Sequence, residues 1–275
     1  MKPYPPKPSM GVLNLKDSAS KFSLTRHEPS EKFRPFVKHY WIIHWNLIGS
    51  PSHTQNVVPN PCVNLVVEPG KTAIYGVSKS VHSHHLEGKG TVFGIKFKPG
   101  GFYPFIKKPV SGLTGQSLGT KDVFGIEPAE MENTILSQNE PEHMVTMIEQ
   151  MLLPYLPATD HKIIQINQIN QIIDHIIQNP DITTVDQICD YIYLNKRTLQ
   201  RMFSQYVGVH PKWVIKLYRL QHAAERMDYK TYEDFLKLST DLGYYDQSHF
   251  IKDFKSIVGK TPEEYIRESH KRRLT

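Results

Sequence analysis

The sequence predicts an α+β protein of two domains, in which a β-rich N-terminal domain precedes an all-α C-terminal domain. Three observations lead to this prediction. Short runs of β-branched and aromatic residues occupy the first part of the chain, apolar residues recur at helical spacing after Asp160, and a helix-turn-helix pattern occurs twice in the second half. The length of 275 residues suits two domains of ordinary size.

The β-rich domain is expected over residues 26–157, after a leader of little structure at 1–25. Pro and Gly residues divide its sequence into short segments that are typical of strands. A barrel is one arrangement that such a domain can take. The strands are expected at three apolar runs, namely 40–43, 62–67 and 91–97.

The last part of this domain has apolar residues at helical spacing. Residues 107–125 have no clear period and predict a loop, and a helix is expected from Pro128 onward. Pro154 and Pro157 end that helix, so the segment from Pro154 to Thr159 is the expected domain boundary.

The C-terminal domain is expected over residues 158–275. Isoleucines spaced three and four residues apart from Ile163 to Ile176 predict a helix, which ends before Pro180 because proline disfavours helix in the residue that precedes it. Six shorter helices are expected after it, near 184–193, 196–207, 211–227, 231–242, 247–257 and 262–269.

Two segments of this domain repeat one pattern at an offset of 51 residues. Each consists of a short helix, a tight turn, a second helix, a Gly that ends it and a Pro that starts the next helix. The matching pairs are Leu199 and Phe250, Phe203 and Phe254, Val207 and Val258, Gly208 and Gly259, and Pro211 and Pro262. The domain therefore contains two helix-turn-helix units, joined by a linker helix over 211–227.

The second helix of each unit has an apolar face and a polar face. In the first unit, Arg197, Gln200, Arg201 and Ser204 share the polar face, with Asn195 as the expected N-cap. Arg pairs with guanine and Gln with adenine in the major groove, and a hydroxyl suits phosphate. The second unit has Asp246 as its expected N-cap, and its polar side holds Ser248, His249, Ile251, Lys252 and Lys255.

The motifs of residues 160–270 resemble the DNA-binding domain of the AraC/XylS transcription regulators. The resemblance rests on the run Leu242-Gly243-Tyr244-Tyr245-Asp246-Gln247-Ser248-His249-Phe250 and on Phe254-Lys255, Gly259 and Thr261-Pro262-Glu263-Glu264-Tyr265. It implies two helix-turn-helix units that enter successive major grooves on one face of DNA. A linker helix of ~25 Å is compatible with grooves one ~34 Å turn apart.

The resemblance also implies which side chains read bases. In the first unit these are Arg197, Gln200 and Arg201, and in the second they are Gln247, Ser248, His249, Ile251 and Lys252. Tyr193 departs from the family pattern, because the family often has Gly at this position of the turn. The β-rich half resembles, more loosely, the sensor or dimerisation domain of some of these regulators, through Tyr40-Trp41, Pro59-Asn60 and the segment Gly94 to Gly101.

The sequence shows no catalytic motif, so we expect neither an enzyme nor a cofactor. The two cysteines, Cys62 and Cys189, are too few for a disulfide framework. Histidines 82, 84 and 85 are interpreted as a polar loop, with a metal site as the alternative, and no metal is expected. The N-terminal decamer lacks the apolar region of a signal peptide, and no segment is apolar enough to span a membrane, so a cytoplasmic protein is expected.

The sequence thus predicts a sequence-specific transcription regulator whose partners are double-stranded promoter DNA and RNA polymerase. A small-molecule effector on the N-terminal domain and a homodimer are further partners that the resemblance allows. Two alternatives stay open. One is a repair-type methyltransferase, or another enzyme, fused to the DNA-binding domain, with Cys62 as the methyl acceptor. The other is a constitutive DNA-binding protein whose β-domain only dimerises.

Overall fold

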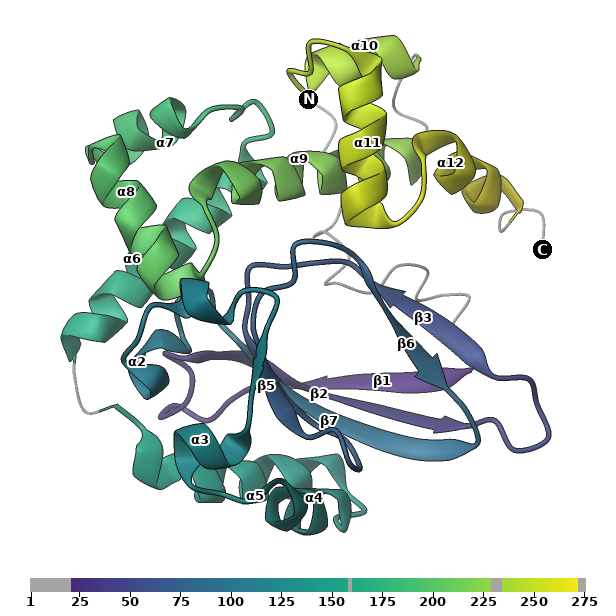
Figure 1. The fold of residues 1–275 in the computed structure, drawn as a ribbon, viewed down its shortest axis with the longest axis vertical. Helices are drawn as coiled ribbons and strands as arrows, with labels where there is room; N and C mark the ends of the chain where they lie inside the picture. The colour runs from purple at the N-terminus through teal and green to yellow at the C-terminus, as the bar shows by residue number, and fades with distance from the viewer. Residues whose placement is uncertain (1–20, 158–159, 229–233, 272–275) are drawn as a thin grey trace.

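The computed structural model describes residues 21–157, 160–228 and 234–271, and its fold is α+β as predicted. A strand-rich N-terminal part is followed by a helical C-terminal part that lies over it (Figure 1). The strands are β1 (Phe22–His27), β2 (Val37–Asn46), β3 (His53–Val57), β4 (Asn64–Val67), β5 (Ala73–Tyr75), β6 (His82–Leu86), β7 (Lys89–Phe97) and β8 (Ser117–Leu118). No helix among the described residues has the length and apolar character that crossing a bilayer requires.

The strands form an open six-stranded antiparallel sheet and a separate two-stranded ribbon. The sheet order is β1-β2-β7-β4-β5-β8, and the ribbon pairs β3 with β6. The edge strands β1 and β8 do not pair with each other in the described part of the chain, so no barrel closes. The last two strands of the sheet are short, since β5 has three residues and β8 has two.

Alternating side chains decide what packs on each face of the sheet. Phe93, Ile95 and Phe97 of β7 are almost fully buried on one face, together with Tyr40 of β2. On the other face β7 has glycines, because tryptophans of β2 lie there. A Cβ atom at Gly94 would lie 2.0 Å from the Trp41 ring. A side chain at this position would therefore force the Trp41 ring to move.

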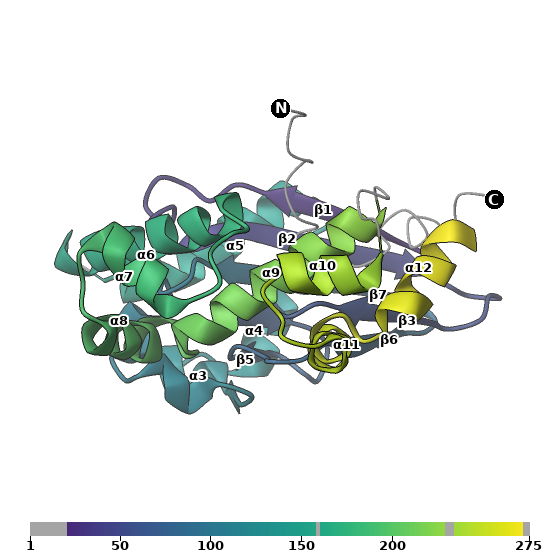
Figure 2. The same ribbon diagram turned by 90° about the horizontal axis from the view of Figure 1, so that it is seen from above.

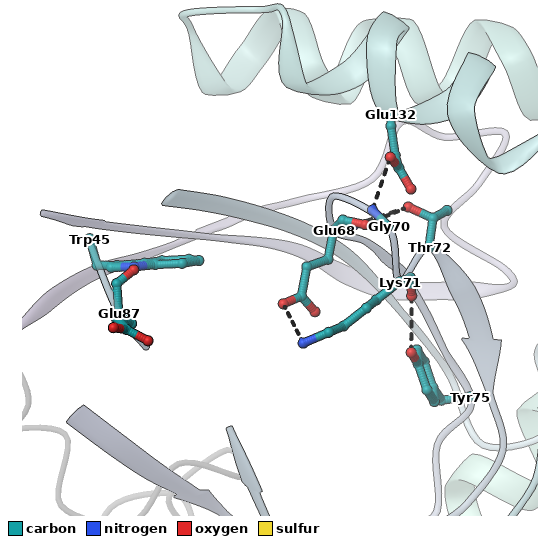
Figure 3. A network of polar contacts seen from close by, with 8 residues as sticks. All are labelled: Trp45, Glu68, Gly70, Lys71, Thr72, Tyr75, Glu87 and Glu132. Atoms are coloured by element: carbon teal, nitrogen blue, oxygen red, sulfur yellow. Dashed lines mark hydrogen bonds and ion pairs between the residues drawn. The ribbon is translucent and has the colours of Figure 1, made fainter. Parts of the chain in front are cut away.

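Short helices cover the first face of the sheet. They are α2 (Tyr103–Ile106), η1 (Val110–Leu113), α3 (Thr120–Phe124), α4 (Pro128–Leu136), α5 (Pro141–Leu152) and η2 (Leu153–Tyr155). Tyr40 donates a hydrogen bond to Glu149 of α5 at 2.9 Å, and Gly70 N donates to Glu132 of α4 at 3.2 Å. Figure 3 shows how this second contact fixes the turn between β4 and β5, which Thr72 closes through Glu68. The helix layer is thus tied to the sheet by polar contacts as well as by its apolar core.

Three sequence expectations need correction in this half. β1 starts at Phe22, so the end of the expected leader is a strand, while residues 1–20 lie outside the described residues. The expected loop at 107–125 contains η1, β8 and α3. The histidines at 82, 84 and 85 lie in β6 rather than in a loop, because backbone pairing with β3 does not require apolar side chains.

The described residues of the C-terminal part form helices and no strand, as predicted. Its long helix of spaced isoleucines and the linker helix both form where the sequence pattern places them. The helices are α6 (Asp160–Gln178), α7 (Val185–Ile192), α8 (Lys196–Met202), η3 (Phe203–Val207), α9 (Pro211–Asp228), α10 (Phe235–Asp241), α11 (Gln247–Val258) and α12 (Pro262–Lys271). An irregularity occurs at η3, where the second helix of the first unit ends in a turn of π-helix.

The two halves share parts of their apolar cores. Val58 and Val77 of the β-rich half are buried within the core of the helical half, and Ile166 of α6 is buried within the core beneath the sheet. Asn170 of α6 also donates a hydrogen bond to the Pro99 carbonyl at 3.0 Å. The two halves are therefore packed against each other.

Candidate nucleic-acid interface

Both predicted helix-turn-helix units form, and their helix ends are built alike. The side chain of Asn195 accepts a hydrogen bond from Thr198 N, and that of Asp246 accepts one from His249 N, both at 2.9 Å. These side chains are the N-caps of α8 and α11, as expected. Gly208 and Gly259 follow the two helices with φ of 91° and 87°, which glycine adopts without strain.

The linker helix α9 separates the second helices of the two units. It has 18 residues, which corresponds to a length of ~27 Å. Figures 1 and 2 together show α8 and α11 at the two ends of α9, on the same side of it, with their axes roughly parallel. Two recognition helices in successive major grooves on one face of DNA need this arrangement.

The polar face of the first recognition helix is open to solvent. Arg197, Arg201 and Ser204 are exposed, and Gln200 is half-buried. Within the described ranges, neither guanidinium has a hydrogen bond or ion pair to another side chain. Both cations are therefore available for a polyanion, at no cost of breaking an internal pair.

The second recognition helix is less basic, and only some of the side chains on its polar side are both exposed and free of hydrogen bonds and ion pairs among the described residues. Ser248, Lys252 and Lys255 are exposed, and Gln247 is half-buried. His249 is exposed too, but its Nδ1 lies 2.6 Å from Asp246 Oδ2. The hydrogen bond from the His249 backbone N–H, and after it this side-chain contact, lowers the pKa of the Asp246 carboxyl. Ile251 packs against the helical core, so only part of its side chain can face a ligand.

A cluster that the sequence reasoning missed fixes the second unit on α9. Asp253 accepts hydrogen bonds from Lys216 Nζ at 3.0 Å and from the Tyr244 hydroxyl at 3.2 Å. The guanidinium of Arg219 lies 4.9 Å from the centre of the Tyr244 ring. The sequence signal was the single acid, Asp253, within the apolar stripe of α11. Its role is to hold α11 against the linker helix.

The β-rich half contacts the C-terminal ends of both recognition helices. At the first unit, Thr114 donates to the Gly208 carbonyl at 2.6 Å, and the rings of Tyr103 and Tyr206 are 4.2 Å apart. At the second unit, Val81 N donates to the Ser256 carbonyl at 3.4 Å. The N-terminal ends of α8 and α11 point away from this contact (Figure 1). The expected base-reading residues at these ends are thus not covered by the β-rich half.

A buried histidine and a buried lysine lie side by side in the sheet. His39 of β2 pairs in register with Lys96 of β7, and they are 5% and 7% exposed. Burial lowers the pKa of His39 to about 3, and the positive charges of Lys96, Arg26 and Lys38 add to this effect. Burial also lowers the pKa of Lys96. In the part of the chain that the structure describes, no acidic side chain forms an ion pair with Lys96.

No group of three or more potential metal ligands occurs among the described residues. In the β3–β6 ribbon, the rings of His82 and His84 lie 6.1 Å apart without a third ligand. Cys62 is 5% exposed and Cys189 is half-buried, and both are free thiols.

A family model for a helix-turn-helix domain matches residues 188–268. Residues 188–268 are a helix-turn-helix domain. The resemblance of this domain to the AraC/XylS regulators is confirmed. A second model, a domain of unknown function (DUF6597), matches residues 25–119, which include most of the sheet.

Two curated relatives match about a third of the chain. An uncharacterized HTH-type transcriptional regulator of Haemophilus influenzae is 25% identical over 103 residues, which are 37% of this chain and 34% of the relative. The F1 operon positive regulatory protein of Yersinia pestis is 31% identical over 99 residues, 35% of this chain and 33% of the relative. The chain thus matches about a third of the length of these relatives.

Solved structures of ToxT from Vibrio cholerae align with most of the chain, but the sequence identity and the TM-score are low. One is 12% identical with a TM-score of 0.33 and covers 90% of this chain and 98% of its own. ToxT bound to an unsaturated fatty acid is 13% identical with a TM-score of 0.35, covering 94% and 96%.

Proposed function

We propose that the chain is a transcription regulator that binds a specific DNA sequence with both units of its helix-turn-helix domain. The observation that carries the proposal is the pair of exposed recognition helices on one side of α9 (Figure 2). Lys and Arg side chains would dock on phosphates, and the residues near the two N-caps would read bases. A regulator bound at a promoter acts on RNA polymerase there, so this enzyme is part of the proposal, as is a cytoplasmic location.

The base-reading residues in the proposal are Arg197, Gln200 and Arg201 of the first unit and Gln247, Ser248, His249 and Lys252 of the second. Ser204 and Lys255 lie nearer the C-terminal ends and suit phosphate. Ile251 offers only the exposed part of its side chain, for example to a thymine methyl group. His249 would have to exchange its contact with Asp246 for a base contact.

Arg201→Ala should weaken binding to the selected DNA site by ~1–3 kcal/mol and relax the preference at one base pair. The reason is loss of a bidentate contact that random DNA does not provide. Fluorescence anisotropy on the selected site and on random DNA measures both affinities. An equal loss on the two DNAs would remove Arg201 from the base-reading set.

Lys255→Ala should weaken binding to all sequences alike. If its ammonium meets only phosphate, the slope of log K against log salt should become shallower by about 0.9, because one fewer counterion is released. Titrations at several salt concentrations measure this slope. A loss confined to the selected site, with the slope unchanged, would instead make Lys255 a base contact.

The proposal includes a small-molecule effector on the β-rich half. This half touches both recognition helices, so a ligand that changes its shape can change how the units are placed. A ligand present at 100 times its dissociation constant should stabilise the folded protein by ~2.7 kcal/mol. A thermal-shift screen of the full chain should find such a compound, and it should also alter DNA affinity. Carboxylates belong in the screen, since Lys96 forms no ion pair among the described residues.

If no compound shifts the melting transition and DNA binding is indifferent to all of them, the β-rich half only dimerises. Analytical ultracentrifugation of the full chain then gives the oligomeric state directly. The methyltransferase alternative needs Cys62 to meet alkylated DNA, and the burial of this thiol opposes that. A mass increase of the protein after incubation with methylated DNA would nevertheless restore it.

A further inference from the structure

Each turn of the helix-turn-helix domain presents a tyrosine that packs against almost nothing. Tyr193 is 94% exposed and Tyr245 is 103% exposed. Tyr193 stands two residues before the N-cap Asn195, and Tyr245 stands directly before the N-cap Asp246. Among the described residues, neither hydroxyl forms a hydrogen bond. An aromatic ring this exposed contributes little to folding, so the fold does not account for either residue.

The backbone at Tyr193 makes this tyrosine unfavourable for the fold. Its φ is 54°, and Lys107 is the only other non-glycine residue with positive φ in the described part of the chain. The second unit has Gly243 in its turn, with φ of 71°. A left-handed conformation is unfavourable for residues other than glycine, and such outliers point to function. The first turn thus holds a strained tyrosine whose side chain, at 94% exposure, gains little from packing on the described residues to offset the strain.

We propose that Tyr193 and Tyr245 contact the sugar-phosphate backbone of DNA, one beside each recognition helix. The proposal rests on the proposed DNA binding. The N-terminal part of a recognition helix enters the major groove, and the turn that precedes it then lies close to a phosphate strand. Tyrosine hydroxyls donate hydrogen bonds to phosphate oxygens, and such contacts fix the register of a protein on the duplex without reading sequence. Each unit would thus have one tyrosine hydroxyl beside its recognition helix that holds the DNA backbone.

The test uses the full chain and the substitutions Tyr193→Phe and Tyr245→Phe, which remove only the hydroxyls. Each should weaken binding about tenfold, equally on selected and random DNA, as expected for a hydrogen bond to a charged group. Because a neutral donor displaces no counterion, the salt slope should not change, in contrast to Lys255→Ala. Tyr191→Phe is the matched control. This tyrosine is 51% exposed, but its ring stacks on His175 with centroids 3.6 Å apart, and its substitution should leave the affinity unchanged.

A second measurement locates the contact. Replacing single phosphates by neutral methylphosphonates should reveal one position at which the wild-type protein and Tyr193→Phe bind equally, and another position for Tyr245→Phe. Tyr193→Gly should keep or raise the melting temperature, because it relieves the left-handed backbone, and should still lose DNA affinity. This result would separate a DNA contact from a structural role.

Unchanged DNA affinity in both Tyr→Phe variants would overturn the proposal, and the exposed rings would then belong to a contact with another protein. That result is distinct from failure of the proposed function. If Arg201→Ala still loses selectivity, DNA binding stands and only the tyrosine contacts fall. If the wild-type protein binds no DNA, both fall together.

Discussion

The protein should lose about 2 kcal/mol of its free energy of unfolding between pH 7 and pH 5 through His39 alone. The pKa of His39 is about 3 in the folded protein, and an unfolded histidine has a pKa of about 6.5. The unfolded state therefore binds this proton first, so the stability is fully present above pH 6.5 and is lost as the pH falls toward 3. The total for such a shift is roughly 5 kcal/mol. Urea unfolding at a series of pH values measures the dependence.

His39→Gln should remove this part of the pH dependence, because glutamine does not titrate. Burial also lowers the pKa of His44 and of His82, and their dependence has the same sign, so it should persist in the variant. The difference between the two pH profiles isolates His39. Parallel profiles for wild type and variant would mean that His39 can be protonated without strain in the folded protein.

Gly208→Ala should lower the free energy of unfolding by about 2–4 kcal/mol, through left-handed strain together with a steric clash. The φ of Gly208 is 91°, and an added Cβ would lie 2.9 Å from the Val110 carbonyl oxygen and 3.0 Å from Thr114 Oγ1. Both neighbours belong to the β-rich half. Chemical denaturation measures the loss, and it reports on the packing between this half and the first unit.

Gly125→Ala is the matched control for backbone strain. Its φ is 66°, but an added Cβ meets nothing within 4 Å. Its loss should be about 1–2 kcal/mol, which is the cost of the left-handed conformation alone. Equal losses at the two glycines would show that the first unit is not held against the β-rich half as Thr114 and Val110 imply.

The helical half was the more predictable part of the fold. Its apolar residues repeat every three or four positions, and Asn195 and Asp246 mark two helix starts that the structure confirms. The β3–β6 ribbon gave no such signal, because His53–Val57 and His82–Leu86 contain few apolar residues and both strands are held mainly by backbone pairing. The two-residue strand β8 is also too short for a pattern to predict.

For the candidate interface, periodicity predicted which side chains face outward but not what surrounds them. Arg197 and Arg201 are exposed as their helical positions require. The contacts at the C-terminal ends of the recognition helices come from Val81, Tyr103 and Thr114. Thr114, for example, lies 94 residues before its partner Gly208 in the sequence. Local sequence carries no information about contacts of this kind. The exposure of Tyr193 and Tyr245 depends on the same three-dimensional packing.

Selection of binding sites from a random DNA library by the full chain tests the central claim most directly. Recognition by both units predicts a bipartite site whose two elements are centred about 10–10.5 base pairs apart, on one face of the duplex. Arg201→Ala should relax base preference in one element, and Lys252→Ala should relax it in the other. A single short element, or a site whose preferences neither substitution alters, would contradict recognition by both units.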